Sequence, residues 1–258
     1  MTNRCSTTLA LLLTLVAGPA LAALNHPFGS HPATYAAGSI KPSHVTQGTL
    51  DQSVRDFYDQ WKTAYVKQVC GPGRYVVEAK AGGGNLTVSE AHGYGMVLMA
   101  LMAGHDPQAQ TIFDGMFAYF RDHPSGITPS LMSWYQSGSC ANANGNDTAS
   151  DGDLDIAFAL LLADKQWGSC GAVNYLAEAQ NVIAGIKSGE LDPTKQFVKL
   201  GDWVSPGDAP YDDSTRSSDF MPDHYRSFLA ATSDTTWTNV LEQTYDIVAA
   251  LQANHSPA

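Results

Sequence analysis

The sequence predicts an all-α protein. Apolar residues recur at helical spacing in at least six segments, and no convincing run of alternating β-branched residues separates these segments. Two segments, 87–102 and 150–167, are apolar nearly all round, whereas the others carry charge on one face. Such alternation is expected when an inner ring of helices is enclosed by an outer ring. A bundle or solenoid would alternate similarly, but no fixed-period repeat is present.

The first helix is expected over 51–68, where Gly71-Pro72-Gly73 stops it. Its apolar stripe comprises Val54, Phe57, Tyr58, Trp61 and Tyr65. A short extended piece follows at 74–78. Thr87 and Glu90 then have the spacing of a capping box for a second helix that runs through Met102.

A third helix is expected over 108–121, with apolar residues at helical spacing. The fourth begins at Ser150, and Asp153 lies three residues on, in a second capping box. The remaining expected helices are 173–187, 222–231 and 237–251.

The chain is expected to carry a secretory signal peptide at 1–22 and one catalytic domain at 23–258. One positive charge precedes the apolar run 9–17, and Ala20-Leu21-Ala22 follows as a small-any-small cleavage pattern. That run is too short for a membrane anchor, which needs about 18 or more apolar residues, and no other membrane candidate follows. The protein is therefore expected outside the cytoplasm, as a monomer, with an irregular arm over 23–47.

The number of cysteines limits the possible disulfide pairings. If Cys5 leaves with the signal peptide, Cys70, Cys140 and Cys170 remain, and Cys140–Cys170 is the expected bridge, with three buried thiols as the alternative.

The net charge of −11 argues against nucleic acid and anionic lipid, because both are negatively charged. A neutral or cationic substrate is favoured.

Residues 149–167 place several carboxylates at the start of a buried helix. Asp151, Asp153 and Asp155 alternate there, and burying an ionised carboxylate without a partner is costly. Glu90 begins the other apolar helix. A glutamate against apolar neighbours can have a raised pKa, while an aspartate near free helix N–H groups stays ionised. This division suits glycoside cleavage. Helix capping alone is the competing interpretation, although it leaves Asp151 and Asp155 as a repelling pair.

Four segments resemble successive blocks of glycoside hydrolase family 8. These are 88–96 (VSEAHGYGM), 131–134 (LMSW), 149–157 with 163–167 (ASDGDLDIA and ADKQW), and 200–203 (LGDW). The family comprises secreted cellulases, chitosanases, lichenanases and xylanases built on an (α/α)6 barrel that act with inversion. The resemblance covers about 51–237.

The resemblance implies roles for individual residues. Glu90 would be the general acid, and Asp151 would hold the sugar at the cleavage point and help to orient the attacking water. Trp134 and Trp203 match aromatic residues that line the cleft, where indole rings can dock against sugar C–H faces. Trp61 and Trp167 are expected in the core. Asp219 lies where the family often has Asn-Pro-Ser-Tyr, and it is a candidate contact with the substrate but not the base.

The chain departs from the family at its C-terminal end. The family's general base comes late, in a block of the form (Asp or Asn)-Ala-any-Arg, and nothing of that form follows Trp237. We therefore expect the last part of the barrel to be absent. No metal and no cofactor are expected, because no zinc-helix spacing, dinucleotide loop or nucleophile elbow is present. His92 is expected as a hydrogen-bonding neighbour rather than a ligand.

The leading hypothesis is hydrolysis of internal β-1,4-glycosidic bonds in a glucan such as cellulose, by an inverting acid/base mechanism. A chitosanase of the same family is the second, since an acidic cleft suits protonated glucosamine. A carbohydrate-binding fragment without catalysis is the third, because no base is found.

Overall fold

The computed structural model describes residues 38–79 and 84–254. The signal peptide expected at 1–22 lies outside these residues, as does most of the arm expected at 23–47. None of the helices in the described ranges has the length and apolar character needed to span a bilayer.

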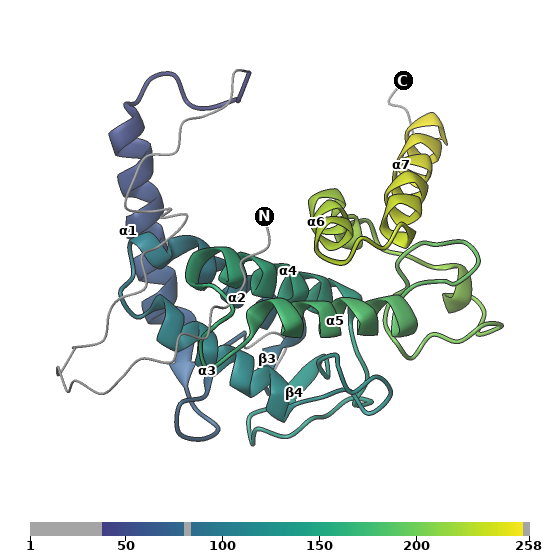
Figure 1. Ribbon diagram of the computed structural model, residues 1–258, viewed down its shortest axis with the longest axis horizontal. Coiled ribbons are helices and arrows are strands. Elements are labelled where there is room, and N and C mark those ends of the chain that lie inside the picture. Colours follow the sequence, from purple (N-terminus) through teal and green to yellow (C-terminus); the bar gives the residue numbers. More distant parts are fainter. Residues whose placement is uncertain (1–37, 80–83, 255–258) are drawn as a thin grey trace, which may run out of the picture.

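Helices dominate the structure (Figure 1). In chain order the α-helices are α1 (Gln47–Tyr65), α2 (Ser89–Leu101), α3 (Ala109–Asp122), α4 (Ser150–Trp167), α5 (Tyr175–Gly189), α6 (Pro222–Thr232) and α7 (Thr236–Asn254). Three short 3-10 turns accompany them: η1 (Met102–Gly104), η2 (Tyr211–Asp213) and η3 (Ser217–Asp219). The predicted all-α class is confirmed, and each predicted helix is present with ends displaced by a few residues.

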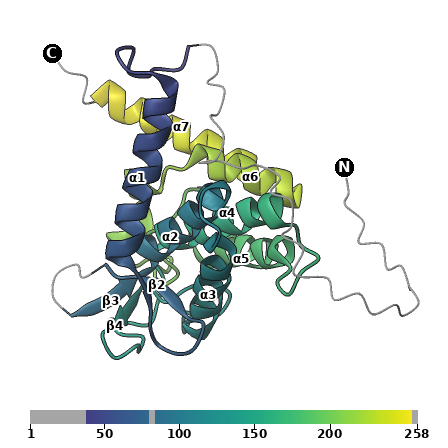
Figure 2. The same cartoon turned by 90° about the vertical axis from the view of Figure 1, so that its left-hand side faces the viewer.

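Two small antiparallel ribbons complete the described fold. Strands β1 (Val66–Gln68) and β2 (Tyr75–Val77) pair with Val66 opposite Val77. Strands β3 (Asn85–Val88) and β4 (Tyr135–Ser137) pair with Val88 opposite Tyr135. The β3–β4 ribbon lies on the side of α2 and α4 that is opposite α6 and α7 (Figures 1 and 2). Only the β2 segment was anticipated as extended, because strands of three or four residues are too short to show a period.

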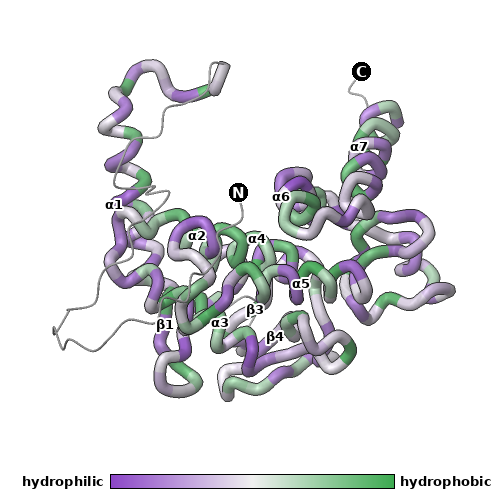
Figure 3. The backbone as a smooth tube through the Cα atoms, in the orientation of Figure 1, coloured by the Kyte–Doolittle hydropathy of each residue, from purple (hydrophilic) through white to green (hydrophobic). Residues whose placement is uncertain are grey.

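Helix α4 forms the centre of the packing. It contacts α2, α5 and α6, and most of its side chains are buried on every face. Both α2 and α4 are rich in apolar residues along their length (Figure 3). The predicted enclosed helix is therefore confirmed for α4, whereas α2 leaves Glu90, Tyr94 and Leu101 exposed.

Glycines allow α2 and α4 to approach closely. A Cβ on Gly93 would lie 2.7 Å from Asp155 Cβ, and a Cβ on Gly152 would lie 2.3 Å from Ser89 Oγ. Both distances are too short for a real side chain, so glycine is required at this crossing. The close crossing brings the first turns of the two helices together.

Both predicted capping boxes are wrong. The N-caps are Val88 for α2 and Ala149 for α4, and neither makes a side-chain capping bond. Ser150 Oγ instead donates to the Lys199 carbonyl, 2.8 Å away, and Asp153 Oδ1 accepts from the Met132 N–H, 2.8 Å away. Because these helix ends are buried, their polar side chains satisfy neighbouring loops rather than their own helix.

The apolar stripe expected along α1 is only partly buried. Tyr58 is buried and Trp61 is half-buried, whereas Val54, Phe57 and Tyr65 are 44 %, 72 % and 48 % exposed. Most of α1 projects away from the other described helices (Figure 1). Helical spacing identified the apolar face of α1, but spacing cannot say whether another element covers it. The helix also ends before 68, because its last residues pair as β1.

The predicted Cys140–Cys170 bridge is wrong. Cys140 pairs with Cys70 across a separation of 70 residues. This bridge ties the β1–β2 turn to the segment after β4. Sequence spacing cannot choose among pairings, because the fold decides which cysteines meet.

Candidate active site

Glu90 and Asp151 lie in the first turns of α2 and α4, the two helices that cross at Gly93 and Gly152. Glu90 is exposed and Asp151 is buried. The two carboxyl groups are close enough for the charge of Asp151 to raise the pKa of Glu90. The structure therefore brings together the two carboxylates selected from the sequence.

Although Glu90 is exposed, the partial burial of its carboxyl is the first cause that raises its pKa, and the charge of Asp151 is the second. Arg216 acts in the opposite direction, and Asp155 raises the pKa slightly further. Among the residues that the structure describes, none donates a hydrogen bond to the Glu90 carboxyl. This group can therefore keep a proton at a pH where an ordinary glutamate has lost it.

Arg216 joins Asp151 to Asp219. Its Nη2 lies 3.6 Å from Asp151 Oδ1, and its Nε lies 3.2 Å from Asp219 Oδ2. Asp151 Oδ1 also accepts from the Gly152 N–H, 2.9 Å away. A positive charge and an N–H donor thus face the Asp151 carboxylate. Nothing in the local sequence around Arg216 indicated that it would meet Asp151, 65 positions away.

Asp219 lies in η3 and is fully buried. Burial raises the pKa of its carboxyl to about 6, against the opposing effect of Arg216. Ser218 Oγ donates to Asp219 Oδ1, 3.0 Å away. Asp219 thus lies behind Arg216, on the protein side of the cluster.

Asp155 finds a partner that the sequence did not indicate. His224 Nε2, on α6, lies 2.8 Å from Asp155 Oδ1, and the His224 ring stacks on Phe158 with centroids 4.0 Å apart. Another helix thus supplies a hydrogen-bonding partner for the Asp155 carboxylate, so its spacing from Asp151 does not leave it without a partner.

Tyr94 lies beside four acidic side chains, Glu90, Asp151, Asp155 and Asp219, which we call the acidic cluster. Tyr94 is 51 % exposed. Burial raises the pKa of its phenol, and so do all four carboxylates of the acidic cluster. Tyr94 follows Glu90 by four residues on α2, so the two share a helix face. That spacing was the signal that could have identified Tyr94 as part of the site.

Trp134 and Trp203 are half-buried and lie on loops. The Trp134 carbonyl accepts from the Ser89 N–H at the start of α2, 2.9 Å away. The residue before Trp203, Asp202, accepts from the Thr148 N–H just ahead of α4, 2.9 Å away. Both tryptophans are therefore held at the same end of the inner helices as Glu90 and Asp151. Trp61 and Trp167 pack against the core, as predicted.

His92 faces away from Glu90. Its Nε2 lies 2.9 Å from the Met116 carbonyl on α3, and burial lowers the pKa of the imidazole to about 4. Within the described ranges, no three His, Cys, Asp or Glu side chains are gathered in a way that could hold a metal.

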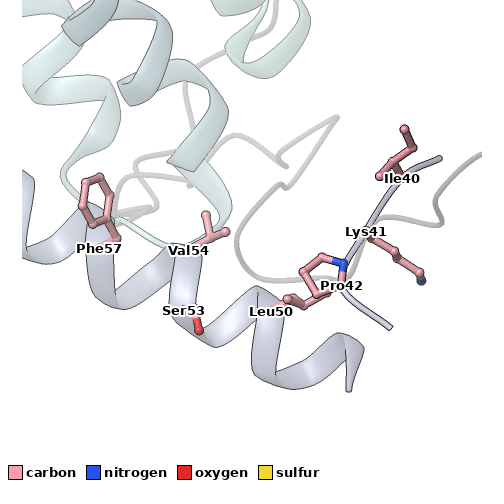
Figure 4. A pocket seen from close by; sticks show the side chains of 7 residues that line it. All are labelled: Ile40, Lys41, Pro42, Leu50, Ser53, Val54 and Phe57. Carbon is pink, nitrogen blue, oxygen red and sulfur yellow. The ribbon is translucent and has the colours of Figure 1, made fainter. Parts of the chain in front are cut away.

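A separate apolar hollow lies at the N-terminal end of α1 (Figure 4). It is lined by Ile40, Lys41, Pro42, Leu50, Ser53, Val54 and Phe57. Its lining includes no carboxylate and none of the site residues predicted from the sequence. The chemistry described above therefore resides in the acidic cluster.

The cluster can perform acid/base chemistry. It combines an exposed carboxyl with a raised pKa, a carboxylate held beside a guanidinium, and aromatic residues close by. Pairs of carboxyl groups with different proton affinities are typical of sites that cleave glycosidic bonds.

Comparison with known proteins gives a consistent result. The sequence model of glycosyl hydrolases family 8 matches residues 46–256. A beta-glucanase of Niallia circulans is 47 % identical over 96 % of this chain and 59 % of its own length. An endoglucanase of Bacillus sp. (strain KSM-330) is 43 % identical over 86 % of this chain and 48 % of its own length.

Solved structures agree with the sequence matches. An apo beta-1,3-1,4-glucanase from Paenibacillus sp. X4 has a TM-score of 0.85 and 46 % identity, over 91 % of this chain and 60 % of that one. A reducing-end-xylose releasing exo-oligoxylanase has a TM-score of 0.67 at 17 % identity, which shows a shared fold only. These likenesses confirm the predicted (α/α)6-barrel fold. The chain spans about half to three-fifths of the length of these relatives.

Proposed function

The chain belongs to glycosyl hydrolase family 8, and on this premise we propose that it hydrolyses internal β-1,4-glycosidic bonds of a glucan. The observation that carries the proposal is the juxtaposition of Glu90 and Asp151, in which the charge of Asp151 raises the pKa of Glu90. A raised pKa supports proton donation to a leaving oxygen near neutral pH.

In the proposed reaction Glu90 is the general acid. It gives its proton to the glycosidic oxygen as the bond to the anomeric carbon breaks, while a water attacks that carbon from the opposite face. Asp151 binds the sugar at the cleavage point and helps to orient this water. Arg216 holds the Asp151 carboxylate in place through the 3.6 Å contact. The general base is not assigned among the described residues.

Trp134 and Trp203 are proposed as sugar-binding surfaces, because a half-buried indole ring can pack against the C–H face of a pyranose. Asp219 was selected as a substrate contact, but it is fully buried. We therefore propose that Asp219 acts indirectly, by fixing Arg216 through the 3.2 Å contact.

The proposed substrate is a neutral polysaccharide. One relative is a beta-1,3-1,4-glucanase and two others are a beta-glucanase and an endoglucanase, so mixed-linkage β-glucan and carboxymethylcellulose are the first substrates to test. Secretion, a monomeric state and the lack of nucleic-acid binding belong to the same proposal, and the net charge of −11 supports the last of these.

The test compares the wild-type chain with Glu90→Gln. Reducing ends released from mixed-linkage β-glucan, carboxymethylcellulose and chitosan are measured for both proteins. Removal of a general acid is expected to lower kcat on the glucans by at least about a hundredfold. Glu178→Gln is the matched control, because Glu178 also lies in the first turn of a helix, α5, away from the acidic cluster. It should retain wild-type activity.

Three outcomes separate the hypotheses. Faster cleavage of chitosan than of either glucan would replace the glucanase by a chitosanase. Glucan binding without turnover, unchanged in Glu90→Gln, would support the binding-only alternative. Inactivity and lack of binding on all three polymers would reject the proposed function altogether.

A further inference from the structure

Two acidic side chains, Asp153 and Glu190, are fully buried behind the first turn of α4. Asp153 Oδ1 accepts from the Met132 N–H, 2.8 Å away, and Glu190 Oε1 accepts from Thr148 Oγ1, 2.5 Å away. The other oxygen of each carboxyl, Asp153 Oδ2 and Glu190 Oε2, has no donor elsewhere in the described part of the chain.

The two carboxyl groups lie close enough for each to act on the pKa of the other, and a hydrogen bond between their two unpartnered oxygens would satisfy both. Because an ionised carboxylate is an acceptor only, such a bond requires a proton on one of the two groups. A single shared proton would partner both of the remaining oxygens. Two ionised groups would instead place two like charges close together in the buried interior, each with a single hydrogen-bond donor, which is unfavourable.

The pair is continuous with a hydrogen-bonded network that joins several loops. Thr148, which donates to Glu190, also accepts from the Asp202 N–H, 2.9 Å away. The Asp202 carboxylate accepts from the Thr148 N–H at 2.9 Å, from Ser125 Oγ at 2.6 Å and from the Thr128 N–H at 3.1 Å. The loops before α4, after α3 and around Asp202 are therefore held through the same few side chains.

This network borders the proposed substrate contacts. Asp151 precedes Asp153 by two residues on α4, and Trp203 directly follows Asp202. Trp134 follows Met132, the partner of Asp153, by two residues. A shift of the buried pair would therefore move the first turn of α4, which carries Asp151, relative to Trp134 and Trp203.

Charges on the surrounding elements also act on the pair. Burial raises the pKa of Glu190 to about 8, and the charges of Asp202 and Asp151 act in the same direction, against the hydrogen bond from Thr148. Lys199 faces Glu190 and Asp202, but its ammonium donates to the Val204 carbonyl, 2.9 Å away.

We propose that Asp153 and Glu190 are a positioning pair that shares one proton, and that this proton holds the first turn of α4 in register with the loops that carry Trp134 and Trp203. The shared proton is a property of the fold. Its consequence for glucan binding rests on the proposed function.

The sign of the pH dependence follows from the raised pKa. An acid that holds its proton more tightly in the folded than in the unfolded state contributes stability that is fully present below its unfolded pKa. That stability is lost as the pH rises through the folded value, which is about 8 for Glu190. The folded protein should therefore lose stability across neutral pH.

The test uses Glu190→Gln and Asp153→Asn. Each amide supplies an N–H in place of the shared proton and retains an oxygen for the Thr148 or Met132 donor. The wild-type Tm is expected to fall by about 5 to 10 °C between about pH 6 and about pH 8, and this fall should be much smaller in both variants. Asp114→Asn is the matched control, because Asp114 is a half-buried carboxyl on α3 that accepts from the Tyr175 hydroxyl instead, 2.5 Å away. The Asp114→Asn variant should show the same fall in Tm with pH as the wild type.

Infrared difference spectra at neutral pH give a direct readout. Wild type minus Glu190→Gln, and wild type minus Asp153→Asn, should each show the C=O band of one protonated carboxylic acid. The shared proton would be ruled out if Tm fell with pH in both variants as much as in the wild type. It would also be ruled out if neither infrared difference spectrum contained such a band.

Binding of a β-glucan oligosaccharide, measured by calorimetry, supplies the positioning readout. Above the pKa of Glu190, about 8, the dissociation constant of the wild type should increase about threefold or more. This corresponds to a loss of about 0.7 kcal/mol of binding free energy. The dissociation constant of Glu190→Gln should not change with pH. An equal increase in both proteins would overturn the positioning role. If the wild type binds no glucan at any pH, the proposed function fails, while the Tm and infrared measurements still judge the shared proton.

Discussion

Arg216 Nη2 lies 3.6 Å from Asp151 Oδ1, although the two residues come from η3's N-terminal flank and the first turn of α4. The same guanidinium contacts Asp219 through its Nε, 3.2 Å away. One cation thus links the carboxylate proposed to bind the sugar with a buried carboxyl behind it.

Replacement of Arg216 by Gln should move the pH profile. Arg216 lowers the pKa of Glu90 and of Asp219, so its removal raises both. A general acid must be protonated, so the alkaline limb of kcat/KM should move to higher pH. At the optimum, kcat/KM should fall roughly tenfold or more, because Asp151 loses its positioning contact.

Arg226→Gln is the control for this profile. Arg226 pairs with Asp223 and Tyr245 on the exposed side of α6 and α7, and its loss should leave both limbs in place. An alkaline limb that moves to lower pH in Arg216→Gln would contradict the electrostatic role assigned to Arg216.

Loss of His224 should destabilise the fold through Asp155. Asp155 is buried, and His224 Nε2 lies 2.8 Å from its carboxylate. His224→Leu leaves that carboxylate without its partner and should lower the free energy of unfolding by about 1 to 3 kcal/mol. Urea unfolding measures this change. The double variant with Asp155→Asn should recover part of the loss, because the amide carries no charge; no recovery would argue that the loss arises from packing against Phe158.

Introduction of a side chain at Gly152 should separate α2 from α4. An added Cβ would lie 2.3 Å from Ser89 Oγ, so Gly152→Ala should cost about 1 to 3 kcal/mol or more of unfolding free energy. Activity should fall further than stability alone predicts, because the crossing sets the relation between Glu90 and Asp151. Gly171→Ala, where the added Cβ meets nothing within 4 Å, should be neutral in both assays.

The Cys70–Cys140 bridge should be recovered by non-reducing peptide mapping. Its removal in a Cys70→Ser, Cys140→Ser double variant should lower the free energy of unfolding by about 4 kcal/mol, as for a loop of this length. Denaturant titration measures the loss. Recovery of a Cys140–Cys170 peptide instead would contradict the observed pairing and restore the pairing expected from the sequence.

Part of the site could be predicted because its information is local. Glu90 and Asp151 each begin an apolar helix, and a helix end places its first side chains at one rim of a helical layer. Tyr94 was within reach of the same reasoning through its spacing from Glu90. Arg216 and His224 were not, because each meets its carboxylate only when distant segments pack together, and nothing in the adjoining sequence encodes that contact.

The sequence by itself determined the order and type of the helices and the enclosed character of α4, because side-chain periodicity is a local property. Tertiary structure alone decided which cysteines pair, which face of α1 stays exposed, and why the predicted capping residues bond to loops instead. It also decided the partners of Asp155, Asp151 and Asp153, since burial and electrostatic contact depend on distances between residues far apart in the chain.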